Sequence, residues 1–219
     1  EPHKQLFREL AMMKVVYHYG GMVVPNSFLC MQNLKPIYDK QMLENKPFVC
    51  EAPNKSHDML THTKQPLFSA STYIMGAPKN DDTVSSIVSY LENRNARSHF
   101  TDEYQFKNDL ATFLSTLTNT KQVDLIDGTL VGVKSSIGKP ILLDHLMEQQ
   151  PLSLNPDCVG LYIPSEEILS RTKYQWFAAL SEDSVLEAEC ALTTIMLESV
   201  STHQLPNRQG DIHRSIAAI

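Results

Sequence analysis

The sequence predicts an α/β fold, a mixed sheet flanked by helices, on two observations. Stretches with apolar residues at every third or fourth position, the helical period, alternate along the chain with short apolar runs. Such continuous apolar runs are typical of strands that helices cover on both faces. The 219 residues, 42% apolar and 20% charged, are sufficient for a core that folds without disulfide or metal support. We predict one domain over residues 1–200, with a C-terminal helix, and a polar tail over residues 201–219.

The first predicted helix covers residues 2–19, because Leu6, Leu10, Met13 and Val16 follow the helical period. Gly20 and Gly21 are then expected to end it, since glycine adopts a positive φ at little steric cost. The next elements are expected to be a strand at 22–24, a helix at 34–44, strands at 48–50 and 69–75, and helices at 83–93 and 101–117.

The second half of the chain begins with a predicted β-hairpin over residues 123–134. Asp127-Gly128 lies between two apolar runs, and this dipeptide favours a tight primed turn. A short strand is expected at 161–164. One long helix is expected at 182–200, because Val185, Leu192 and Ile195 repeat at helical spacing.

The segment from Tyr17 to Ser27, Tyr-His-Tyr-Gly-Gly-Met-Val-Val-Pro-Asn-Ser, resembles a motif of glycosyltransferases with a GT-A-like fold. In that family a helix, Gly-Gly and a strand precede an Asp-x-Asp motif, whose carboxylates hold a divalent cation against the diphosphate of the sugar donor. Aligned on Gly20 and Gly21, the two acidic positions fall on Pro25 and Ser27, with Asn26 between them. The resemblance therefore implies a GT-A-like remnant with a degenerate sugar-nucleotide motif.

Hard cations such as Mg²⁺ and Mn²⁺ prefer carboxylate oxygens, which residues 25–27 do not offer. We therefore expect no metal site and no cofactor. Mn²⁺ or Mg²⁺ is expected only if the chain is instead an active glycosyltransferase. The family's nucleoside-binding βα units would also precede residue 1, so they are expected to be absent from this chain.

The resemblance extends over residues 7–177, through Leu34-Lys35-Pro36-Ile37, Gly132-Val133-Lys134 and the segment 163–177. Gly132-Val133-Lys134 and the segment 163–177 also resemble glycosyltransferase-like proteins of large DNA viruses, whose function is itself not established. The resemblance implies a chain that resides in the host cytoplasm or in the virion.

Two further sets of residues are candidates for a site. Glu51 follows an apolar strand, and the carboxyl ends of strands are where open α/β sheets collect their ligands. Tyr174, Trp176 and Phe177 form an aromatic group that could stack on a sugar, anchor a protein partner or close the end of the core.

The net charge of −6, without a cluster of Lys and Arg, argues against nucleic-acid binding. No apolar run approaches the length of a membrane-spanning helix, so no membrane insertion is expected. The four scattered cysteines form no Cys-x-x-Cys pair and are expected to be free thiols.

Two function classes remain open at this point. In the first, the chain is a non-catalytic glycosyltransferase-like protein, a structural or assembly component of a large DNA virus particle that binds protein partners. In the alternative, it is a metal-independent or weakly active glycosyltransferase that uses a nucleotide-sugar donor. A sugar-binding protein without turnover lies between the two.

Overall fold

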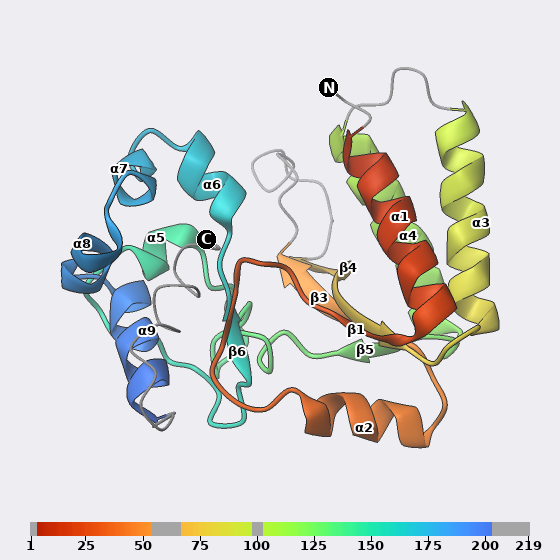
Figure 1. Ribbon diagram of the computed structural model, residues 1–219, viewed down its shortest axis with the longest axis horizontal. Coiled ribbons are helices and arrows are strands. Elements are labelled where there is room, and N and C mark those ends of the chain that lie inside the picture. The colour runs from red at the N-terminus through yellow and green to blue at the C-terminus, as the bar shows by residue number, and fades with distance from the viewer. Residues whose placement is uncertain (1–3, 54–66, 98–102, 203–219) are drawn as a thin grey trace. The chain divides into compact units, whose positions relative to one another are not determined.

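The computed structural model describes residues 4–53, 67–97 and 103–202, which form two compact units (Figure 1). The first unit comprises residues 1–24 and 34–128, and the second comprises residues 25–33 and 129–219. The mixed sheet flanked by helices that the sequence predicts is confirmed. No helix in these described ranges is both long enough and apolar enough to cross a membrane.

The first unit contains a four-stranded sheet of order β1-β4-β3-β5. Its strands are β1 (Gly21–Val23), β3 (Phe48–Pro53), β4 (Phe68–Ala77) and β5 (Asp124–Ile126). β4 pairs antiparallel with both β1 and β3, whereas β3 and β5 run parallel. The sheet is therefore mixed, because the chain reaches β5 through a helical crossover and not through a turn.

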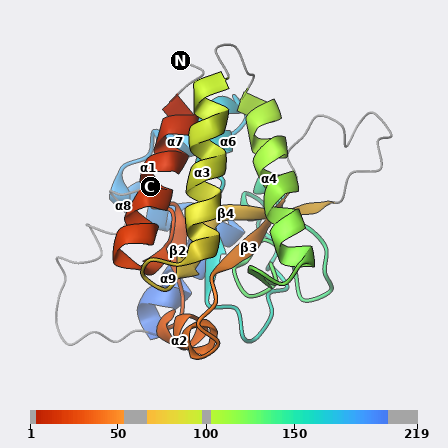
Figure 2. The same cartoon turned by 90° about the vertical axis from the view of Figure 1, so that its right-hand side faces the viewer.

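Three helices cover one face of this sheet: α1 (Lys4–Tyr19), α3 (Asp82–Arg97) and α4 (Glu103–Asn119) (Figures 1 and 2). Their apolar sides and the sheet form the first core, which buries Leu6, Met13, Val16, Val49, Met75, Val84, Ile87, Leu91, Phe106, Leu110, Leu114 and Val123, among others. The shorter α2 (Lys35–Leu43) has a proline in its first turn. The helical periodicity in the sequence is thus explained by burial of one side of each long helix.

The predicted hairpin over residues 123–134 is wrong. β5 ends at Ile126 and pairs parallel with β3, and the chain does not return beside it. Gly128 is not among the glycines that have a positive φ, whereas a primed hairpin turn requires a positive φ at this position. Its N–H instead donates a hydrogen bond to Glu51 Oε2 at 2.8 Å, so a tertiary contact replaces the turn.

The second unit contains a two-stranded antiparallel sheet of β2 (Phe28–Cys30) and β6 (Gly160–Tyr162). Its helices are α5 (Leu143–Leu146), α6 (Ser165–Ser170), α7 (Gln175–Ala178), α8 (Glu182–Glu187) and α9 (Ala191–Thr202). A second core packs these elements together and buries Leu143, Leu146, Leu161, Ile163, Ile168, Tyr174, Phe177, Val185, Leu192 and Ile195, among others.

The single C-terminal helix predicted over residues 182–200 is two helices, α8 and α9. Ala188 adopts an extended backbone with φ −66° and ψ 127°, which ends α8. Ala191 N–H then donates to the carbonyl of Glu148 at 2.7 Å at the start of α9. A contact with a distant segment therefore decides the break, and α9 runs on to Thr202 at its C-terminal end.

Candidate functional site

Gly20 and Gly21 make the turn that the sequence predicts between α1 and β1. Their φ angles are +68° and +98°, and Gly20 N–H donates to the Val16 carbonyl at 2.8 Å. A Cβ on Gly20 would lie only 2.8 Å from the Lys79 nitrogen, so a side chain there would collide with the segment after β4. The glycines thus end the helix and permit a close backbone approach.

Pro25, Asn26 and Ser27 belong to the second unit, whereas Gly20 and Gly21 belong to the first. The Pro25 carbonyl accepts a hydrogen bond from Phe28 N–H at 3.1 Å, and the Ser27 carbonyl accepts one from Ile163 N–H at 2.9 Å. The backbone at these positions therefore helps to form the β2-β6 sheet. The side chains of Asn26 and Ser27 supply neutral oxygens, which are weaker ligands for a hard cation than carboxylates.

Glu51 lies within β3 and not at the end of a strand, because β3 continues to Pro53. Its side chain is partly buried and accepts the hydrogen bond from Gly128 N–H described above. A second polar contact joins the segment just before β3 to β5, since Lys46 Nζ lies 2.6 Å from Asp124 Oδ1. The Glu51 side chain therefore holds the segment that follows β5 in place beside β3.

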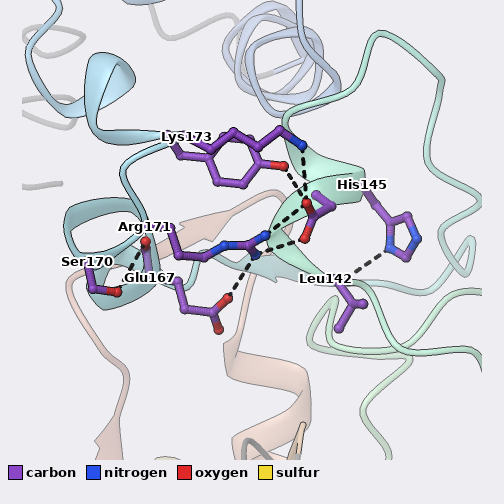
Figure 3. A network of polar contacts seen from close by, with 8 residues as sticks. Leu142, His145, Glu167, Ser170, Arg171 and Lys173 are labelled. Atoms are coloured by element: carbon purple, nitrogen blue, oxygen red, sulfur yellow. Dashed lines mark hydrogen bonds and ion pairs between the residues drawn. The ribbon is translucent and has the colours of Figure 1, made fainter. Parts of the chain in front are cut away.

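A polar cluster in the second unit surrounds Asp144, in the first turn of α5 (Figure 3). Arg171 donates two hydrogen bonds to its carboxylate, Nη1 to Oδ2 at 2.8 Å and Nη2 to Oδ1 at 3.0 Å. The Tyr174 hydroxyl donates to Oδ1 at 2.5 Å, and Lys173 Nζ lies 3.5 Å from the same oxygen. One carboxylate thus joins α5 to the segment between α6 and α7.

Arg171 and the ends of the short helices have further contacts in this cluster (Figure 3). Arg171 Nη1 lies 3.7 Å from Glu167 Oε2, one helical turn before it. His145 Nδ1 accepts a hydrogen bond from Leu142 N–H at 3.0 Å, which satisfies a donor at the start of α5. The cluster therefore also stabilises helices of only four to six residues.

The electrostatics of the cluster favour its charged forms. Hydrogen bonds from Arg171 and then Tyr174 hold the pKa of the Asp144 carboxyl well below its usual range. The hydrogen bond to Asp144 raises the pKa of Arg171, and hydrogen bonding to Tyr174 is the largest cause that raises the pKa of Lys173. A carboxylate that remains ionised and accepts three donors is a poor proton donor or acceptor at neutral pH.

The structure separates the three aromatic residues of the predicted group. Tyr174 and Phe177 are buried in the second core, at 4% and 5% exposure, whereas Trp176 is 48% exposed. Trp176 meets Phe177 edge to face, with ring centroids 5.6 Å apart. The rings of Tyr174 and Phe177 therefore close the core, and Trp176 lies at the surface.

Sequence reasoning missed Asp144 and Arg171. They are 27 residues apart, and no motif or period connects them. The sequence signal here is the basic and aromatic composition of residues 171–177, which points to the aromatic rings and not to Asp144. A bidentate pair of this kind requires the fold to bring two short segments together.

Among the described residues, no group of three His, Cys, Asp or Glu side chains is arranged to hold a metal ion. The four cysteines are free, and burial raises the pKa of the Cys50 thiol. In comparisons with protein-family models, curated proteins and solved structures, none matched this chain.

Proposed function

We propose that this chain is a non-catalytic, glycosyltransferase-like protein that serves as a structural or assembly component. The setting that the resemblance implies is the particle of a large DNA virus. One observation carries the proposal: polar groups at three of the candidate site positions are engaged in contacts that hold the fold. Glu51 binds Gly128 N–H, Tyr174 binds Asp144, and the Ser27 carbonyl binds Ile163 N–H.

These contacts support the proposal because a catalytic group must be able to reach a substrate and change its protonation or its partners. The Asp144 carboxylate accepts from Arg171 and Tyr174, and its low pKa follows from those bonds. Fold and function are separable, so a scaffold can keep its glycine turn after its site has changed.

The exposed Trp176 supports a role in binding protein partners. Tyr174 and Phe177 belong to the core, which leaves Trp176 as the member of the aromatic group that another protein can contact. Leu169, 62% exposed at the end of α6, is tied to α7 because Gln175 Nε2 donates to its carbonyl at 2.8 Å. Tryptophan is enriched among the residues that dominate interface energies.

The test is calorimetric titration of the full-length protein with UDP-sugars and GDP-sugars, each with and without Mn²⁺. We expect no binding heat in any arm. Metal-dependent binding would overturn the proposal in favour of a glycosyltransferase, and metal-independent binding would favour the weakly active alternative. The variants Glu51→Ala and Glu51→Gln then separate two roles for this carboxylate.

If Glu51 only supports the fold, Glu51→Ala lowers the free energy of unfolding by about 1–3 kcal/mol, because it leaves the Gly128 N–H without its acceptor. Glu51→Gln keeps an acceptor oxygen and is expected to cost less. If Glu51 binds a nucleotide sugar, both variants reduce the binding heat of the titration.

A further inference from the structure

The ring of His145 closes the turn that leads into α5. Leu142, the residue before α5, donates its N–H to His145 Nδ1 at 3.0 Å, and Figure 3 shows the ring turned toward Leu142. A backbone N–H can only donate, so Nδ1 is an unprotonated acceptor and the neutral ring carries its proton on Nε2. The hydrogen bond therefore exists in only one of the two charge states of this side chain.

Protonation of the ring removes this acceptor. In the charged ring both nitrogens are donors, so two N–H groups would face each other and the ring has to turn away from Leu142. His145 is exposed, so it takes up a proton directly from water. Histidine is the side chain that ordinarily changes its charge between about pH 5 and 8. We therefore expect the bond to Leu142 to be present at about pH 7.5 and to be lost at about pH 5.5.

The other titratable groups around α5 are of types that ordinarily keep their charge over this range. Carboxylic acids titrate near about pH 4, and lysine, arginine and tyrosine at about pH 10 or above. The Asp144 carboxyl beside His145 stays ionised, because hydrogen bonds from Arg171 and then Tyr174 hold its pKa well below its usual range. The groups on α5, on the segment bonded to Asp144, and on or next to α9, which packs on α5, are Asp144, Glu148, Arg171, Lys173, Tyr174, Glu189 and Glu198. His145 is thus the group at α5 whose charge is expected to change.

Other contacts hold α5 in place in both charge states of the ring. Leu143 and Leu146 are 1% and 0% exposed, and they bury the inner side of the helix in the second core. The Asp144 carboxylate accepts two hydrogen bonds from Arg171. Loss of the Leu142 bond therefore opens the turn before α5 and leaves the helix itself on the core.

We propose that His145 is a pH-sensitive latch of the second unit. The neutral ring holds the turn at Leu142 closed, and the protonated ring releases it. The ring and the backbone N–H form a local two-state element, in which one proton decides whether the hydrogen bond can form. This pH response goes beyond the proposed assembly function and requires no sugar nucleotide.

The first test is amide hydrogen exchange of the full-length protein, measured by NMR at about pH 7.5 and about pH 5.5. The rates are expressed as protection factors, so the intrinsic dependence of exchange on pH cancels. We expect the protection factor of Leu142 to fall about fivefold or more, the equivalent of one hydrogen bond of about 1 kcal/mol. Ile141 N–H is the internal control, because it donates to the Val133 carbonyl at 3.0 Å and a carbonyl does not titrate. Its protection factor should change little.

Variants of His145 identify the titrating group. His145→Gln keeps a side-chain acceptor that cannot gain a proton, and His145→Ala has no acceptor at all. We expect the pH dependence at Leu142 to disappear in both variants, with more protection in His145→Gln than in His145→Ala. His18→Gln is the matched control, since His18 is an exposed histidine of the first unit whose ring meets that of Tyr17 edge to face. It is expected to leave the response of Leu142 unchanged.

The nitrogen chemical shifts of the imidazole test the starting point directly. At about pH 7.5 they should show the proton of His145 on Nε2. Three outcomes would overturn the proposal: a proton on Nδ1 at this pH, a protection factor of Leu142 that is the same at both pH values, or a pH-dependent fall that persists in both His145 variants. Sugar-nucleotide binding is measured separately by the titration, so the two proposals fail independently.

Discussion

The hydroxyl of Tyr174 donates a hydrogen bond of 2.5 Å to Asp144 Oδ1, and the same carboxylate accepts two hydrogen bonds from Arg171. Tyr174 is buried at 4% exposure, and the Arg171 guanidinium lies 4.9 Å from its ring centroid. Tyr174 thus combines a charge-assisted hydrogen bond to Asp144 with a cation–π contact to Arg171. It fixes α5 against the segment that leads into α7.

Removing the Tyr174 hydroxyl should destabilise the second unit while leaving its packing intact. Tyr174→Phe keeps the buried ring but loses the bond to an ionised acceptor, so we expect a loss of about 1.5–3 kcal/mol. Urea unfolding followed by tryptophan fluorescence measures it, because Trp176 is the single tryptophan. Tyr19→Phe, at a site 79% exposed, is the control and should change little. Equal losses in both variants would contradict a specific role for Tyr174.

The contribution of Asp144 should depend on pH in a defined direction. Its pKa is lower in the folded protein than in the unfolded chain, because Arg171 and Tyr174 donate to the charged form. The stabilisation is therefore fully present above the unfolded value of about 3.9 and is lost as the pH falls from there toward the folded pKa. The measurement is the difference in unfolding free energy between the native chain and Asp144→Asn, from pH 7 to pH 3. We expect this difference to be constant near neutrality and to shrink below about pH 4.

Gly76 should tolerate no side chain, because of one core ring. A Cβ at this position would lie 2.4 Å from Phe48 Cε1, and Phe48 is fully buried. Gly76→Ala is expected to cost about 1–3 kcal/mol through overpacking, measured by urea unfolding followed by circular dichroism. In a Phe48→Leu background the same substitution should cost less, since the smaller side chain leaves room. A cost that is identical in both backgrounds would assign the effect to the backbone.

Phe177 and Trp176 are neighbours in sequence, but they should differ in how much each side chain contributes to the free energy of unfolding. Phe177→Ala removes a ring with 5% exposure from the second core, and we expect a loss of about 3–5 kcal/mol. Trp176→Ala removes a ring that is 48% exposed, and we expect about 1 kcal/mol. Thermal unfolding followed by circular dichroism compares the two. A larger loss at Trp176 would mean that its ring belongs to the core and not to a contact surface.

The sequence correctly predicts those elements whose structure depends on residues close to one another along the chain. The helical period of Leu6, Met13 and Val16 predicted α1, and Gly20 and Gly21 predicted where it ends. Both signals are local, because a helix repeats within a few residues and a positive φ is a property of one residue.

The tertiary structure alone decided the contacts between distant segments. Asp127-Gly128 carries the local signal for a hairpin, yet Glu51, 77 residues from Gly128, takes the Gly128 N–H. The apolar period across residues 182–200 predicts one helix, yet the Glu148 carbonyl binds Ala191 N–H where α9 begins. Asp144 and Arg171 likewise meet only in the folded chain. A local preference is worth about 1 kcal/mol or less per residue, so a tertiary hydrogen bond and the burial around it can reverse it.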